Sequence, residues 1–245
     1  MILRRFSSAL RRQDWPALAL EIVVVVLGVF IGLQVSNWNE ARLEAQREAL
    51  YLAALREDFV AVIAELEGDI ARYEEIANAM TLLLVEAHKP APELPLAELA
   101  AAVRLLTAME GTPIVSDTYT NLTGSGDLAI ISSQAIKNAM AAFFSKADTI
   151  ELVGDTHEMQ LVNIFQPYII AHLDYVDFLR DAQGLRQSAP FAPERVLAAL
   201  PTPEFRNVVA VKWDITTDLR SLLLRALTEA RTVEGLLGEE LAQRS

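Results

Sequence analysis

The sequence predicts an all-α protein, in which an N-terminal transmembrane helix continues into a long stalk helix and packs into an antiparallel helical bundle. Three observations predict this fold class. The 20 residues from Pro16 to Val35 contain one ionisable side chain, Glu21. Three later segments repeat apolar residues at alternating steps of four and three, which is typical of a packed helix face in a bundle or coiled coil. No segment shows sustained apolar–polar alternation, so no sheet is expected.

The apolar run is long enough to cross a bilayer. As a helix, 20 residues extend about 30 Å, the thickness of a hydrocarbon core. Trp15 and Trp38 bracket the run, where aromatic rings would anchor the helix in the two headgroup layers. A cleaved signal peptide is disfavoured because the run is too long and no small-residue cleavage site follows it. The sequence therefore predicts a basic cytoplasmic tail at 1–15, a transmembrane helix at 16–36 and an extracytoplasmic helical bundle at 37–245.

Charge is distributed unevenly along the chain. Of the net charge of −12, residues 1–16 carry +3, so the remainder carries −15. Arginines are more numerous before the apolar run than just after it, which favours a cytoplasmic N-terminus. The acidic body is unsuited to a phosphate backbone, so no nucleic-acid partner is expected. The absence of cysteine excludes disulfides, cysteine-ligated zinc and thiol catalysis.

A small-residue motif lies within the predicted transmembrane helix. Gly28 and Gly32 form the G-x-x-x-G spacing that allows two membrane helices to approach closely. Glu21 and Val25 fall near the same stripe of the helix. Since a carboxyl group in a membrane helix usually faces protein or water, these four residues form a candidate helix–helix contact. The alternative is that the glycines are there by chance and that Glu21 reaches the membrane interface.

The long helices of the bundle are predicted from their apolar seams and their breakers. The first should run from the membrane to the prolines of "HKPAPELP", with a solvated acidic outer face. A second follows a serine cap at Ser132 or Ser133 and is bent or interrupted at Pro167, and a third starts near Pro203. The seams comprise Phe59, Ile63, Leu66, Ile70, Tyr73, Ala77, Met80 and Leu84; Ile136, Met140, Phe143, Ala147, Ile150, Gly154, His157, Leu161, Ile164 and Tyr168; and Val208, Val211, Ile215, Leu219, Leu222, Ala226, Ala230, Val233 and Leu237.

Shorter elements connect the long helices. We expect a helix over residues 96–109, a brief helix at 117–122 capped by Asp117, and a short helix near 194–200. The segment "TGSGD" follows the second of these and predicts a tight turn.

Two stretches resemble one known family. In "EIVVVVLGVFIGLQVSNWNE", the pattern of an aliphatic run ending in Asn-Trp-Asn-Glu is similar to the N-terminal signature of a family of uncharacterised bacterial membrane proteins, domain of unknown function 6090. "TYTNLTGSGDLAII" resembles the family's second motif. The resemblance implies a bacterial single-pass inner-membrane protein with a helical body, and it implies no catalytic residue. The matching positions are Glu21, Ile22, Gly28, Leu33, Gln34, Asn37, Trp38, Asn39 and Glu40, and then Thr118, Tyr119, Leu122, Ser125, Gly126 and Leu128.

No pattern in the sequence predicts a catalytic, cofactor or metal site. His157 begins "HEMQL", which lacks the second histidine of a zinc motif, and its seam position favours a hydrogen-bonded core histidine. His88 and His172 lack ligand spacing. Tyr119, Asn121 and Asp127 gather polar groups near one turn, either for packing and capping or as an interaction turn.

The favoured hypothesis is a non-catalytic, membrane-anchored structural or interaction protein, a scaffold or accessory component of the bacterial envelope. Its expected partners are the lipid bilayer and either a membrane or periplasmic protein or a second copy of the chain. The alternative is a sensor-like bundle that binds a ligand between its helices and acts through a membrane partner.

Overall fold

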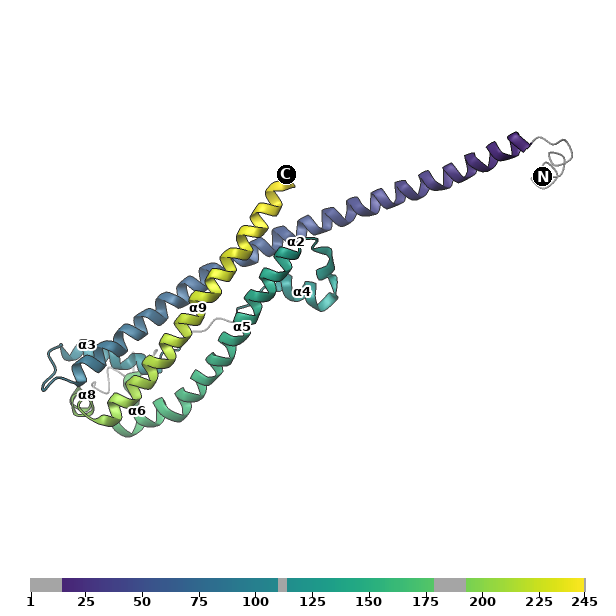
Figure 1. Ribbon diagram of the computed structural model, residues 1–245. Helices are drawn as coiled ribbons and strands as arrows, with labels where there is room; N and C mark the ends of the chain where they lie inside the picture. Colours follow the sequence, from purple (N-terminus) through teal and green to yellow (C-terminus); the bar gives the residue numbers. More distant parts are fainter. Residues whose placement is uncertain (1–14, 110–113, 179–192, 245) are drawn as a thin grey trace. The chain divides into compact units, whose positions relative to one another are not determined.

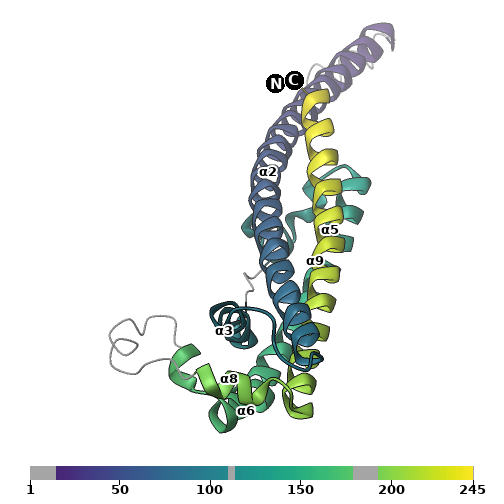
Figure 2. The ribbon, with the colours of Figure 1, turned by 90° about the vertical axis from the view of Figure 1, so that its left-hand side faces the viewer.

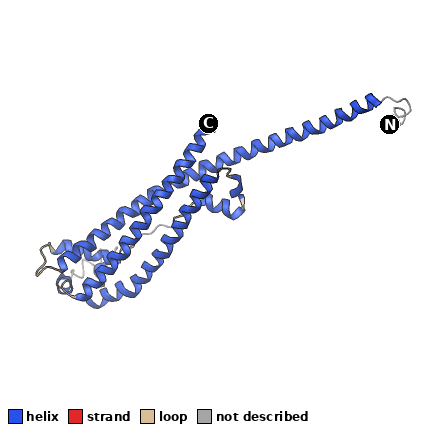
Figure 3. Ribbon diagram, in the orientation of Figure 1, coloured by secondary structure: helices blue, strands red, loops and turns tan. Residues whose placement is uncertain are grey.

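The computed structural model describes residues 15–109, 114–178 and 193–244. These residues form helices and loops without a strand (Figure 3), so the all-α prediction is confirmed. The elements are α2 (Trp15–Ala87), α3 (Leu96–Arg104), η1 (Leu105–Thr107), α4 (Asp117–Ser125), η2 (Asp127–Ile130), α5 (Gln134–Gln160), the π-helical turn η3 (Leu161–Phe165), α6 (Gln166–His172), η4 (Tyr175–Phe178), α8 (Pro193–Ala199) and α9 (Pro203–Gln243).

The chain forms two compact units, residues 1–51 and 52–245. In the first unit, the described residues belong to α2. Its apolar side chains from Leu20 to Val35 are at least half exposed. A window of this helix has a mean hydropathy of 2.3 with none of its residues buried, so α2 is long and apolar enough to cross a membrane.

The second unit is a bundle of three long helices, the part of α2 from Leu52 onward, α5 and α9 (Figures 1 and 2). Helix α9 runs antiparallel to the other two, whereas α2 and α5 run parallel to each other, so the predicted antiparallel arrangement is wrong for this pair. The short elements between α2 and α5 return the chain to the end of the bundle where α2 enters it, which allows the parallel direction.

The core of the bundle joins the three helices through apolar contacts. Phe59 of α2 meets Phe143 of α5 edge to face, with ring centroids 5.1 Å apart. On α9, a continuous stripe from Phe205 to Leu237 is buried. Burial of these aliphatic and aromatic side chains is the main favourable term in folding.

The buried stripes follow the predicted spacing but differ from the prediction by one residue at several positions. On α9, Lys212 and Leu223 are buried, whereas the apolar pattern predicts Val211 and Leu222. A lysine was left out of the seam because the pattern was read from apolar residues alone. On α2, the buried positions include three that the narrow seam omitted, because this helix packs against two neighbours and needs a wider stripe. They are Val62, Ile76 and Leu83.

The acidic face of α2 is partly engaged rather than only solvated. Glu67 accepts from Arg231 at 2.6 Å and Glu74 from Arg220 at 3.2 Å, both arginines lying on α9. Arg56 of α2 reaches Glu234 of α9 at 2.8 Å. These pairs are about half exposed, so each adds little stability, but together they favour the antiparallel register of the two helices.

Helix α4 begins with a cap from Ser116, not from the predicted Asp117. The Ser116 hydroxyl accepts from the backbone N–H of Tyr119 at 3.1 Å, and it donates to Asp58 of α2 at 2.6 Å. The helix extends to Ser125 and ends where Gly126 adopts φ 80°, a left-handed conformation that favours glycine. The predicted helix at 117–122 was therefore three residues too short.

The remaining connections adjust the predictions in detail. Helix α3 ends at Arg104 and passes into the short 3-10 turn η1, before the predicted end at residue 109. Of the two predicted caps of α5, Ser132 and Ser133, the structure uses Ser133, whose hydroxyl lies 3.4 Å from the backbone nitrogen of Ile136. Pro167 lies in the first turn of α6, directly after the π-helical turn η3. Since proline has no N–H to continue the helical ladder, the chain interrupts its α-helix here, as predicted.

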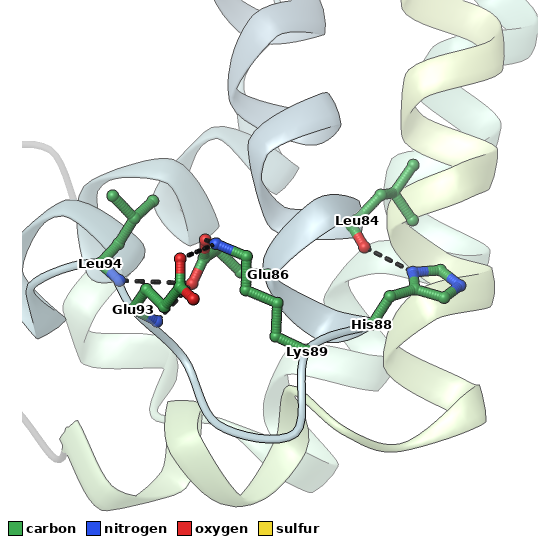
Figure 4. Close-up of polar contacts among 6 residues, drawn as sticks. All are labelled: Leu84, Glu86, His88, Lys89, Glu93 and Leu94. Atoms are coloured by element: carbon green, nitrogen blue, oxygen red, sulfur yellow. Dashed lines mark hydrogen bonds and ion pairs between the residues drawn. The ribbon is translucent and has the colours of Figure 1, made fainter.

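At the C-terminal end of α2, the buried carboxylate of Glu86 organises the proline-rich loop (Figure 4). It accepts from the Lys89 ammonium at 2.6 Å and from the backbone N–H groups of Glu93 at 2.8 Å and Leu94 at 3.3 Å. The hydrogen bond from Lys89, followed by that from Glu93, holds the pKa of Glu86 below its ordinary value. A buried carboxylate with several donors is stable in its charged form, so this loop is fixed by Glu86.

Candidate functional site: a cavity beside a buried histidine and lysine

The bundle contains a cavity of about 480 Å³ between α2, α5, α9 and the segments that flank residues 110–113. This volume lies within the range of small-molecule sites in proteins. Most of its lining is apolar or aromatic. The lining side chains of this kind are Tyr73, Met109, Ile114, Val115, Phe144, Ala147, Ile150, Leu219 and Leu223.

Carboxylates supply the charge around the cavity. Four lie on α5, at Asp148, Glu151, Asp155 and Glu158, and Asp69 of α2 is the fifth. The steps of three, four and three residues put the four on one face of the helix. All four are exposed, so they form a rim. No lysine or arginine is among the described lining residues, which makes the rim negative.

His157 also lines the cavity and lies beside Lys212 in the interior of the bundle. Both side chains have no exposed surface. The Lys212 Nζ lies 2.7 Å from His157 Nε2 and donates to the backbone oxygen of Ala108 at 2.5 Å. The same Nζ is 5.3 Å from the ring centroid of Phe165, which belongs to the π-helical turn η3. These partners satisfy a lysine that would otherwise be costly to bury.

Burial sets the protonation of this pair. It lowers the pKa of Lys212 to about 7. Burial, followed by the nearby charge of Lys212, lowers the pKa of His157 to about 3. His157 is therefore neutral at pH 7, and Lys212 exchanges its proton near that pH.

The pair determines which nitrogen of His157 carries its hydrogen. A charged Lys212 has only donors, so Nε2 of His157 must accept from it. The hydrogen of the neutral ring then lies on Nδ1. This Nδ1 is buried and has no hydrogen-bond partner among the described residues. Because an unpaired buried donor costs about 1–3 kcal/mol, the site presents a donor that a ligand's acceptor could satisfy.

Two more polar atoms near the pair are also buried without a partner among the described residues. Gln160 Oε1 lies three residues after His157 on α5, and Thr216 Oγ1 lies four residues after Lys212 on α9. Buried polar groups are normally hydrogen-bonded. These two atoms lie about one helical turn along the chain from His157 and from Lys212, and their hydrogen-bonding capacity is unused among the described residues.

The other two histidines lie elsewhere and share no site with His157. His88 Nδ1 lies 2.6 Å from the backbone oxygen of Leu84 at the end of α2 (Figure 4). His172 stacks on Tyr168 in α6, with ring centroids 4.6 Å apart. Across the described ranges, no three histidine and carboxylate side chains are arranged to hold a metal ion.

The predicted interaction turn is built mainly by packing and capping. Tyr119 stacks on Phe144 of α5 at 4.0 Å between ring centroids. Asn121 is exposed, and its backbone oxygen accepts from Ser125. Asp127 is partly exposed and lies in η2. The three residues lie on one connection, but their role in binding stays a prediction.

The predicted membrane residues all lie on the first part of α2. Gly28 and Gly32 have open space around their Cα atoms, so a second helix could approach them. Val25 is 61% exposed, and Trp15 and Trp38 are 63% and 68% exposed. Glu21 is exposed on the same helix. The contact face and the interface anchors therefore stay predictions, on a surface that the chain leaves free.

Comparison with known protein families, curated proteins and solved structures finds no match for this chain. The resemblance to domain of unknown function 6090 therefore stays a prediction.

Proposed function

We propose that this protein is a membrane-anchored, non-catalytic ligand-binding protein of the bacterial inner membrane. Its bundle binds a small molecule in the cavity and passes the bound state to a membrane or periplasmic partner. The observation that carries the proposal is His157, a residue that lines a cavity of about 480 Å³ and whose buried Nδ1 has no partner among the described residues. A ligand acceptor would remove the cost of this unpaired group.

The anchor supports a role at the membrane. The apolar helix before Val35 has the length of a bilayer, and the arginine excess before it favours a periplasmic bundle. Gly28 and Gly32 offer a contact face to a partner in the membrane, through which the bound state could be passed on.

A scaffold that docks onto another protein is the second candidate, and one surface favours it. Leu152, Met159 and Val162 are 67%, 59% and 55% exposed. Their spacings of seven and three residues put them on one face of the helix formed by α5 and η3. An exposed apolar strip of this kind is typical of a protein-binding surface.

Native mass spectrometry of the full-length protein, extracted from the membranes of its own cells, tests ligand binding. The informative variant is Gly154→Leu. Gly154 lines the cavity, and a Cβ added there meets nothing within 4 Å. The leucine side chain therefore occupies cavity space, while replacing a helical glycine with a better helix former. Gly235→Leu is the matched control, because Gly235 lies inside α9 with equally open space and does not line the cavity.

We expect a small molecule to co-purify with the wild type and with Gly235→Leu, but not with Gly154→Leu. A wild-type protein that carries no added mass, or an added mass that Gly154→Leu retains, would overturn the proposal. A photocrosslinker at Met159 that traps a protein under the same conditions would then favour the scaffold.

A further inference from the structure

The cavity also indicates the chemistry of its ligand. We infer that it takes an amphipathic organic cation, with the cationic head at the carboxylate rim, the apolar body inside and a hydrogen-bond acceptor directed at His157. This inference rests on the proposed ligand-binding function and adds the class of ligand.

The charge of the lining selects a cation. Four exposed carboxylates of α5, at Asp148, Glu151, Asp155 and Glu158, line the cavity, and the described lining includes no lysine or arginine. Among the described lining residues, His157 is the side chain that could carry a positive charge. It is neutral at pH 7, because burial lowers its pKa to about 3. An anion would be repelled at the mouth, and a cation would be concentrated there.

The interior selects an apolar body. Tyr73 and Phe144 supply aromatic surface, and Ile150, Leu219 and Leu223 supply aliphatic surface. A hydrophilic cation, such as a short polyamine, would leave this surface without a partner. A ligand with aromatic or branched aliphatic groups would remove it from water, which is the largest favourable term in such sites.

The buried pair fixes the orientation of the ligand. The Lys212 ammonium lies 2.7 Å from the far nitrogen of His157, so an ammonium head placed deep in the cavity would face a second cation. An uncharged acceptor, such as a carbonyl oxygen, has no such penalty. It can accept from Nδ1–H of His157, which has no partner among the described side chains and backbone groups. The head therefore stays at the rim, near Glu151 and Asp155.

A series of probes on one scaffold separates these features. The reference is phenylalanine 2-phenylethylamide, which has an ammonium group, two phenyl rings and one carbonyl. A neutral analogue replaces the ammonium group with hydrogen, and an anionic analogue replaces it with carboxylate. A fourth probe keeps the ammonium group but replaces the amide with a trans-alkene, which removes the acceptor and preserves the shape. Binding is measured by calorimetry on the full-length protein in lipid nanodiscs, with empty nanodiscs subtracted.

We expect the ammonium probe to bind at least about tenfold more tightly than the neutral and alkene probes, and the carboxylate probe to bind least. Equal binding of the neutral or anionic probe would overturn the choice of a cation, and equal binding of the alkene probe would overturn the role of His157. If no probe binds although native mass spectrometry finds a retained molecule, the ligand class is wrong and the proposed function stands. If both experiments fail, the proposed function is wrong.

Paired charge variants test the rim directly. Glu151→Gln with Asp155→Asn removes two carboxylates from the lining. Glu57→Gln with Glu65→Gln removes two exposed carboxylates from α2 that do not line the cavity. The first pair should weaken the ammonium probe at least about fivefold and leave the neutral probe unchanged, while the second pair should change neither. An equal loss in both pairs, or no loss in the first, would contradict binding at the rim.

Discussion

Replacing Lys212 with methionine should change how the stability of the bundle depends on pH. Lys212 is fully buried, and burial lowers its pKa from 10.5 to about 7. Methionine fills a similar volume without an ionisable group. The variant also leaves Ala108 O and His157 Nε2 without their donor, which has a cost of its own that does not vary with the protonation of a lysine.

The sign and size of the pH effect follow from the two pKa values. Between pH 7 and pH 10.5, the unfolded chain keeps the proton on Lys212 while the folded chain has released it. The unfolded state therefore binds more protons in this window, so the free energy of unfolding rises with pH. A difference of about 3.5 between the two pKa values, at about 1.36 kcal/mol for each unit, gives a full rise of about 5 kcal/mol in the wild type. About 4 kcal/mol of it falls between pH 7 and pH 10.5, because Lys212 is half-titrated at each end of this window. Lys212→Met should lack this rise.

The free energy of unfolding of the full-length wild type and of Lys212→Met is measured by urea unfolding between pH 6.5 and pH 10, followed by far-ultraviolet circular dichroism. The effect of Lys212 is the difference between the two pH profiles. This pH range lies above the titration of His157 in the folded chain, where its pKa is lowered to about 3. Histidines of the unfolded chain titrate near pH 6.5 in both proteins, so their contribution largely cancels in the difference. Lys137→Met on α5 is the control, because Lys137 is partly exposed. Its pH profile should match that of the wild type.

Parallel pH profiles for the wild type and Lys212→Met would refute the assignment of a depressed pKa to Lys212. A wild-type profile that falls between pH 7 and pH 10 relative to the variant would also refute it. Parallel profiles would mean that the hydrogen bond to Ala108 and the Phe165 ring offset the effect of burial on the ammonium, and a falling profile would mean that they outweigh it.

Three further predictions concern the anchor and the loop after α2. The full-length chain should stay with membranes after an alkaline carbonate wash, and its release would contradict a transmembrane helix. Gly28→Leu should reduce chemical crosslinking of the protein within membranes, by a reagent that forms no disulfide. Gly68→Leu, in the bundle, should leave this crosslinking unchanged. If Gly28→Leu also leaves it unchanged, the predicted contact face is wrong. Glu86→Gln should speed hydrogen exchange at the backbone amides of Glu93 and Leu94. The effect is expected above about pH 4.5, where the carboxylate of the wild type is charged. Unchanged exchange would show that the loop is held by other contacts.

The sequence predicted the long helices well because their signals are local and repeated. The step of three and four residues needs no knowledge of the partner helix, and a proline or a serine cap ends or begins a helix by its own chemistry. Ser133 and Pro203 set their helix starts in this way. The cap of α4 was assigned one residue too late because Ser116 is selected by a contact with Asp58, which is 58 residues away.

The cavity and its buried pair were beyond the sequence because they depend on contacts between helices. His157 and Lys212 are 55 residues apart. The apolar pattern included His157 in a predicted seam, but it left out Lys212. One signal was present: Lys212 lies four residues after Val208 and three before Ile215, on the predicted stripe. A lysine at such a position needs a partner, and His157 on the facing seam was the available base.

Nuclear magnetic resonance of the full-length protein with ¹⁵N-labelled histidine tests the central claim most directly, because the chain has three histidines and His157→Gln assigns the buried one. At pH 6, where Lys212 is charged and His157 is neutral, the expected signal is a neutral ring with hydrogen on Nδ1. This Nδ1 resonance should shift when phenylalanine 2-phenylethylamide is added. A charged ring, hydrogen on Nε2, or a His157 signal that does not move at saturating probe would contradict a ligand cavity built around His157.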